Sequence, residues 1–78
     1  MKLKVIKDVN GREKLILANS LRVIDHEVRD AIHGGTITEK YVEVVVVGRH
    51  RNTKWKEWYP LKKFLEMNPN ITLEELMR

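Results

Sequence analysis

The sequence predicts a small single domain of the α+β class, with a mostly antiparallel sheet and a short C-terminal helix. Three observations lead to this prediction: two pairs of strand-like segments, an amphipathic stretch between the pairs, and helix-capping signals near the C-terminus. A chain of 78 residues has room for one compact domain, which spans residues 1–78. Its 42% hydrophobic and 33% charged residues are typical of a folded domain rather than a disordered one. The expected order of elements is β-β-α-β-β-α.

The first strand pair comprises KLKVIK at residues 2–7 and EKLILA at residues 13–18. The connector between them contains Asn10-Gly11, a pair that tolerates the positive φ angles of a tight turn. The opening segment is therefore predicted to be a β-hairpin.

The stretch that follows, residues 21–33, is predicted to be an amphipathic helix. Ser20 is suited to cap its N-terminus, and Gly34-Gly35 supplies a stop. Apolar side chains recur at helical spacing at Leu21, Ile24, Val28 and Ile32. The opposite side of this helix would carry Arg22, His26, Arg29, Asp30 and His33.

The second strand pair is predicted at residues 41–48 and 54–59, joined by a turn at residues 48–53. The four consecutive valines at 44–47 indicate a strand in the middle of a sheet, or one covered on both faces. Pro60 suits the start of a helix over 61–67, which Asn68-Pro69-Asn70 ends. A capping box at residues 72–75 predicts a last short helix.

Strand alternation sorts the side chains of this second hairpin onto two faces. Trp55, Glu57 and Tyr59 share one face, and Lys54, Lys56 and Trp58 share the other. Because burying two lysines is unfavourable, we expect Trp55 and Tyr59 to contact the core and Trp58 to face outward.

Positive charge is concentrated in this hairpin and just after it. Residues 49–63 carry six Lys or Arg against one acid, a net +5, whereas the whole chain carries +4. Cations interleaved with aromatic side chains are typical of surfaces that contact phosphates and stack bases. The sequence therefore predicts a small regulator or accessory factor that binds nucleic acid, DNA or RNA. The expected contact residues are Arg49, His50, Arg51, Lys54, Lys56, Trp58, Lys62 and Lys63.

Two other interpretations of the same residues stay open. The basic hairpin would also suit an acidic protein, or could be only a solvated surface. If Val42, Val44 and Val46 face the core, then Tyr41, Val45 and Val47 form a second apolar face. Left uncovered, that face would serve a protein-binding module, an adaptor, an inhibitor or a homodimer without nucleic-acid contact.

We expect no catalytic activity and no cofactor. On the predicted helix, His26, Asp30 and His33 recur at a spacing that could bring them to one metal, but no fourth ligand accompanies them, so no metal site is expected. Asp25 and Glu27 would point to different sides of the helix and so cannot act as a paired acid and base.

The composition also bounds where the protein acts. The chain has no Cys, which excludes disulfides and thiolate metal sites and favours a cytoplasmic location. The longest uninterrupted apolar run, residues 44–47, is far too short to span a membrane, so no membrane partner is expected.

Overall fold

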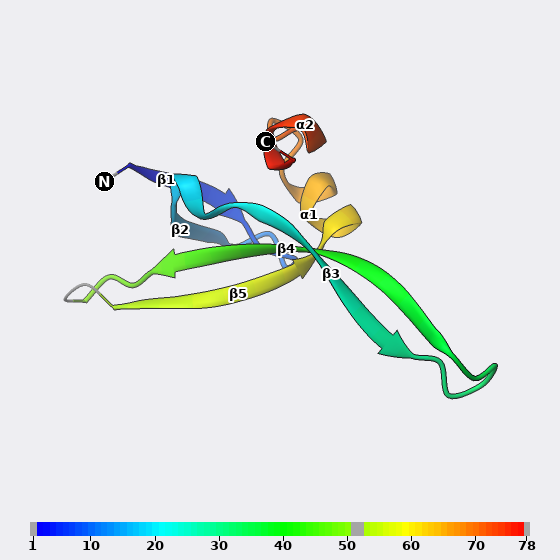
Figure 1. The fold of residues 1–78 in the computed structure, drawn as a ribbon. Helices are drawn as coiled ribbons and strands as arrows, with labels where there is room; N and C mark the ends of the chain where they lie inside the picture. The colour runs from blue at the N-terminus through cyan, green and yellow to red at the C-terminus, as the bar shows by residue number, and fades with distance from the viewer. Residues whose placement is uncertain (1, 51–52, 78) are drawn as a thin grey trace.

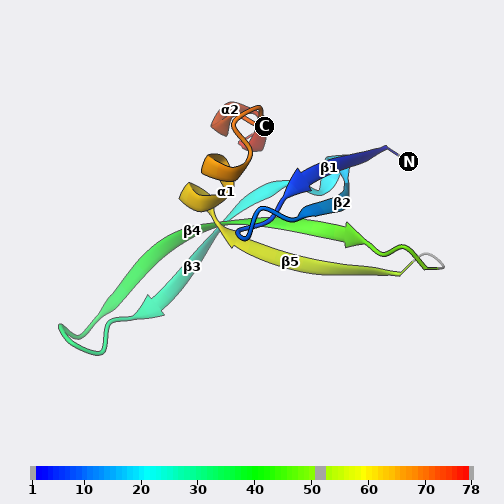
Figure 2. The same cartoon turned by 180° about the vertical axis from the view of Figure 1, so that it is seen from behind.

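The protein, described by a computed structural model over residues 2–50 and 53–77, is an α+β domain built on one antiparallel sheet (Figures 1 and 2). The sheet order is β1-β2-β4-β3, and β5 pairs with the other edge of β4. The short 3₁₀ turn η1 follows β2, and two short helices follow β5. The elements are β1 (Leu3–Lys7), β2 (Glu13–Leu17), η1 (Ala18–Ser20), β3 (Arg22–Arg29), β4 (Thr36–Val47), β5 (Lys54–Pro60), α1 (Leu61–Met67) and α2 (Leu73–Leu76).

The predicted first hairpin is confirmed, with β1 and β2 in register from Leu3 opposite Leu17 to Lys7 opposite Glu13. Its turn is held by Asp8, whose carboxylate accepts hydrogen bonds from the backbone N–H groups of Asn10 and Arg12. Gly11 has a φ of 79°, a backbone conformation that glycine adopts without strain.

The prediction of a helix over residues 21–33 is wrong. Residues 22–29 form β3, which pairs with β4 along eight successive positions, from Arg22 opposite Glu43 to Arg29 opposite Thr36. Gly34 and Gly35, expected to end a helix, have φ angles of 72° and 85° and form the turn of this hairpin. The physical reason is that β-branched side chains fit a strand, and long-range pairing with β4 outweighs a local helical periodicity.

Ser20 is not a helix cap, which corrects a second expectation. It lies in η1, where its hydroxyl donates to the carbonyl of Leu17 and accepts from the backbone N–H of Val45. The side chain therefore ties the connection between β2 and β3 to β4 near its C-terminal end.

Strand β4 is the centre of the sheet because it pairs with β3 and β2 along one edge and with β5 along the other. Its valines 42, 44 and 46 are buried, and helix α1 packs against β4 and β5 on the face on which they lie (Figure 1). The buried apolar core consists of Ile6, Ile16, Val42, Val44, Val46, Tyr59, Phe64, Ile71 and Leu76.

Both C-terminal helices agree with the prediction. The Thr72 hydroxyl caps α2 by accepting from the N–H of Glu75 at 3.2 Å. Buried Asn68, just after α1, donates to the carbonyls of Lys7 and Phe64 and accepts from the N–H of Lys7 at 2.8 Å. This one side chain thus fixes the end of α1 against the end of β1.

The β3–β4 hairpin extends far beyond the rest of the domain (Figures 1 and 2). Pairing between β4 and β5 ends where Tyr41 faces Pro60, so residues 36–40 pair only with β3. Residues 25–40 therefore form a two-stranded projection, hereafter the arm, and the molecule measures 45 Å along its longest axis and 26 Å along the next.

Candidate nucleic-acid interface

The second hairpin presents two different faces, set by its pairing with β4. Trp58 lies opposite Glu43, Lys56 opposite Val45, and Lys54 opposite Val47. These three side chains are exposed. They lie on the face of the sheet away from α1 and α2, hereafter the outer face. The outward direction expected for Lys54, Lys56 and Trp58 is therefore what the structure shows.

Trp58 is held by a buried carboxylate. Its indole N–H donates to Glu43 Oε2 at 3.0 Å, and Glu43 is only 8% exposed. Arg22 binds the other oxygen of the same carboxylate at 2.8 Å, and Lys56 lies 3.8 Å from it. The hydrogen bond from Trp58 lowers the pKa of Glu43, and Arg22 and Lys56 lower it further. Together they outweigh the desolvation of the carboxyl, which acts to raise this pKa. The ring of Trp58 is thereby fixed in orientation while the residue stays 52% exposed.

A shallow groove of about 430 Å³ lies beside Trp58 on the outer face. Ile24 and His26 from β3, Tyr41 from β4 and Trp58 from β5 line it. The rings of His26 and Tyr41 meet edge to face with their centroids 5.5 Å apart. Its aromatic walls could hold a flat, unsaturated ring system such as a nucleobase.

Sequence reasoning missed three of the four groove residues. Ile24 and His26 were assigned to a helix, where they could not lie beside β4, and Tyr41 was considered only as part of an apolar face. The missed signal was the β-branched side chains of Val23, Ile24 and Val28 ahead of Gly34-Gly35, which are also typical of a strand entering a hairpin turn.

The hairpin tip carries the expected cations. Arg49 and His50 are exposed, and the turn is closed by a hydrogen bond from Gly48 N–H to the Thr53 carbonyl. Within residues 2–50 and 53–77, no carboxylate lies within 4.0 Å of a charged nitrogen of Arg49 or Lys54. Arg51, also expected at the tip, lies outside the described residues.

Lys62 and Lys63 occupy a different place. They are exposed in the first turn of α1, and Lys63 lies 3.8 Å from Glu66. Seven residues of β5 separate them from the hairpin tip, a distance of roughly 20 Å along an extended strand. The structure thus does not bring them next to Lys54 at the tip.

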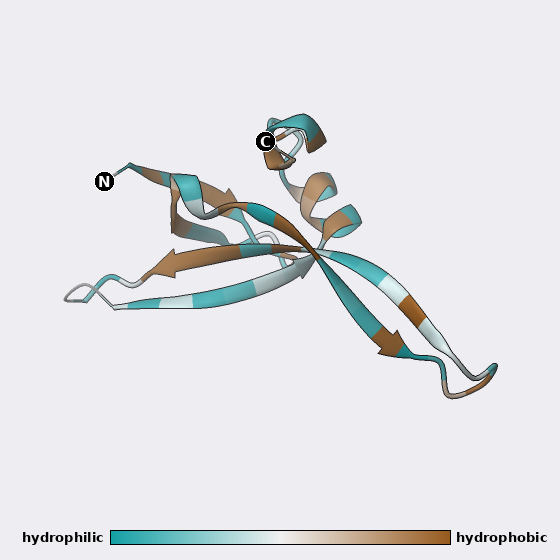
Figure 3. Ribbon diagram, viewed as in Figure 1, coloured by the Kyte–Doolittle hydropathy of each residue, from teal (hydrophilic) through white to brown (hydrophobic). Residues whose placement is uncertain are grey.

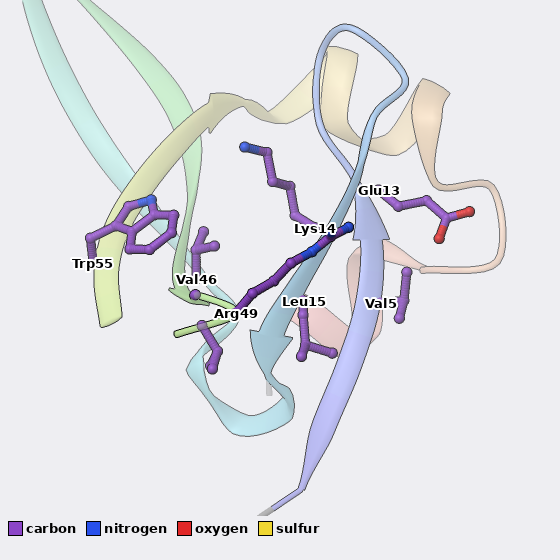
Figure 4. A pocket seen from close by; sticks show the side chains of 9 residues that line it. Val5, Glu13, Lys14, Leu15, Val46, Arg49 and Trp55 are labelled. Atoms are coloured by element: carbon purple, nitrogen blue, oxygen red, sulfur yellow. The ribbon is translucent and has the colours of Figure 1, made fainter. Parts of the chain in front are cut away.

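Trp55 is not a core residue, contrary to the expectation. Its side chain is on the same side of the sheet as buried Tyr59, but the helices do not extend over the tip end of β5, and Trp55 is 44% exposed. Figure 4 shows it at one side of a groove of about 350 Å³ whose other side is formed by the β1–β2 hairpin. The indole N–H donates to Glu57 at 2.6 Å, and the Tyr59 hydroxyl donates to the same carboxylate.

The structure does not bring His26, Asp30 and His33 together as one helix face would. At the end of the arm, His33 Nδ1 lies 3.2 Å from Asp30 Oδ2. His26 instead lies on β3 and faces Glu39 across the strand pair. Among the described residues, no group of three or more potential ligands is close enough together to hold a metal ion. Within the same residues, no helix is long and apolar enough to cross a membrane.

Comparison with known proteins gives no relative for this chain: no protein-family model, no curated protein and no solved structure matches it.

Proposed function

We propose that this protein binds single-stranded nucleic acid on the outer face of its β4–β5 hairpin and acts in the cytoplasm as a regulator or accessory factor. The observation that carries the proposal is Trp58: a half-exposed indole beside an aromatic groove, fixed by a buried carboxylate that Arg22 and Lys56 also approach.

The stacking argument starts from the fixed ring. A free tryptophan side chain loses rotamer freedom when a base stacks on it, and this loss reduces affinity. The hydrogen bond from Trp58 to Glu43 imposes part of that ordering before any ligand binds. An unpaired base can slide onto the ring, whereas bases within a duplex are already stacked on each other, so the geometry favours single strands.

The charge argument concerns the backbone of the ligand. Lys54 shares the outer face with Trp58 and lies toward the hairpin tip from it, so it can contact a phosphate on the tip side of a stacked base. Arg49 lies at the tip itself, where its side chain lines the groove beside Trp55 (Figure 4), so it can contact phosphates only where a strand continues past the tip. Lys56 is closer to Trp58, but its ammonium also interacts with Glu43 at 3.8 Å. We therefore expect Lys54 to contribute more than Lys56 to phosphate binding.

Replacing Trp58 with alanine tests the stacking surface. Trp58→Ala should weaken binding of single-stranded DNA or RNA by about 1 to 3 kcal/mol, because one base loses its stacking partner. The salt dependence of binding should stay the same, since no cation is removed. Fluorescence anisotropy with labelled single-stranded and duplex oligonucleotides, at low and at moderate salt, measures both quantities.

The chain offers a matched control in Trp55, which is on the same strand but the other face of the sheet. Trp55→Ala should leave the affinity for single strands nearly unchanged, with circular dichroism to confirm that both variants fold. Equal losses in the two variants would contradict a stacking site on the outer face. Absence of binding by the unmodified protein at low salt would refute the nucleic-acid proposal as a whole.

One observation favours the alternative, a protein-binding module. The outer face of the arm exposes Val28 at 37% and Ile37 at 51%, and apolar side chains in such positions are common at protein contacts. The alternative predicts no affinity for nucleic acid even at low salt.

A further inference from the structure

The arm exposes apolar side chains that nothing within the described chain covers. Val28 and Ile37 face each other across the strand pair near its end, where Figure 3 shows apolar bands on both strands. A two-stranded ribbon that packs against no third element is marginally stable in water. The outer face of the arm is therefore better suited to contact than to solvent.

The order of side chains along this face is regular. Residues directly opposite each other in β3 and β4 form a series of pairs in which polar and apolar pairs alternate. From the domain toward the end of the arm, the pairs are Arg22–Glu43, Ile24–Tyr41, His26–Glu39 and Val28–Ile37. In each polar pair the Arg or His belongs to β3 and the glutamate to β4.

This order makes the face complementary to itself. A two-fold axis running along the arm, between β3 and β4, places β3 of one copy over β4 of the other. Val28 then meets Ile37 of a second copy, Ile24 meets Tyr41, and His26 meets Glu39. Every apolar pair meets an apolar pair, and the Arg and His side chains meet glutamates.

We infer that two copies of this chain pack outer face to outer face, so that one arm is stacked on the other and both point the same way. The opposite face of the arm suits solvent in such a dimer. Its pairs are polar: Asp25–Lys40, joined by a 2.8 Å ion pair, Glu27–Thr38 and Arg29–Thr36. The occupant is a second copy rather than nucleic acid because residues 22–40 carry four acids against three Lys or Arg and so do not attract phosphates.

The dimer has a consequence for the groove beside Trp58. Ile24 and Tyr41 belong both to that groove and to the self-complementary face, so a second copy covers the surface on which a base would stack. Dimer formation and single-strand binding then compete, because the stacking surface of Trp58 is accessible only in the monomer. This competition rests on the proposed function, whereas the pairing of two copies does not.

Sedimentation equilibrium tests the pairing without any ligand. The unmodified chain should pass from its monomer mass of 9.2 kDa to twice that value as concentration rises. Ile37→Asp should raise the dissociation constant at least about tenfold, because it buries an unpaired charge in the contact. Thr36→Asp, its neighbour on the opposite face, should leave the dissociation constant unchanged. A chain that stays monomeric, or equal effects of the two variants, would overturn the inference.

Charge exchange tests the arrangement of the two copies. His26→Glu should weaken the dimer by facing Glu39 of the other copy with a like charge, and the added substitution Glu39→Lys should restore it. Failure of the double variant to recover would contradict an axis along the arm.

The competition has its own readout. Single-stranded oligonucleotide should shift the unmodified protein toward monomers, and Ile37→Asp should bind the oligonucleotide more tightly than the unmodified protein at concentrations where the latter is dimeric. A dimer that binds single strands without dissociating would overturn the competition alone. A dimer with no affinity for any nucleic acid would refute the proposed function and leave the pairing standing.

Discussion

Phe64→Ala is expected to remove a large part of the free energy of unfolding, about 3 to 5 kcal/mol. Phe64 is 1% exposed and is the largest of the fully buried side chains; its ring centroid lies 6.0 Å from that of Tyr59. It is the main contact through which α1 covers the sheet, and a chain of this size has roughly 4 to 12 kcal/mol of total stability. The expected loss is therefore at least about a quarter of the total stability.

Urea unfolding followed by circular dichroism measures this loss. Leu73→Ala is the matched control, since Leu73 is also a large apolar residue of the C-terminal helices but is 48% exposed. Its cost should stay within about 0.5 kcal/mol, as for other surface substitutions. A Phe64→Ala variant as stable as Leu73→Ala would show that the helices do not hold the sheet in the way described.

Removing Arg49, Lys54 and Lys56 together should produce the largest loss of nucleic-acid binding. If each cation contacts one phosphate of a single strand, the triple alanine variant loses about 2 units from the slope of log affinity against log salt. At low salt this corresponds to a loss of affinity on the order of 10² to 10³-fold. The loss should be similar for all oligonucleotide sequences, because phosphate contacts carry no sequence information.

Titrations at several salt concentrations give the slope directly. Arg12→Ala provides the control, because Arg12 is an exposed cation in the turn of the β1–β2 hairpin, away from the proposed interface. It should change the slope by much less than any one of the three interface cations. Binding that survives loss of all three with the slope unchanged would place the contact elsewhere on the molecule.

Local signals in the sequence were sufficient for most of the elements. The Asn10-Gly11 turn, the valine-rich central strand and the cap at Thr72 each rest on residues close together in the chain, and the structure confirms all three. The structure also confirms a helix over residues 61–67, directly after Pro60.

The stretch over residues 21–33 shows where local signals fail. Leu21, Ile24, Val28 and Ile32 fit a helical period, but Ile32 is 87% exposed in the turn, so the spacing does not mark a buried face. What decides the structure is pairing with β4, whose partner residues lie up to 21 residues away in the sequence. The strand β4 is longer than predicted for the same reason, since residues 36–40 are extended by pairing with β3.

The candidate site likewise contains residues that local signals predict and residues that depend on the whole sheet. Alternation along β5 was enough to direct Trp58 and its neighbouring lysines outward, because it depends on one strand alone. The partners of Trp58 come from two other strands, and Glu43 and Ile24 could be assigned to it only once the sheet was known. Exposure of Trp55 likewise depends on how far the helices reach, which strand alternation does not specify.

The fluorescence of Trp58 gives the most direct test of the central claim, that single-stranded nucleic acid stacks on the outer face. The chain contains two tryptophans, so Trp55→Phe leaves Trp58 as the only indole and Trp58→Phe leaves Trp55. A base stacked on Trp58 should quench the emission of Trp55→Phe in a saturable titration with a single-stranded oligonucleotide, while Trp58→Phe shows little change under the same conditions. Quenching of Trp55 instead of Trp58, or of neither, would contradict the account.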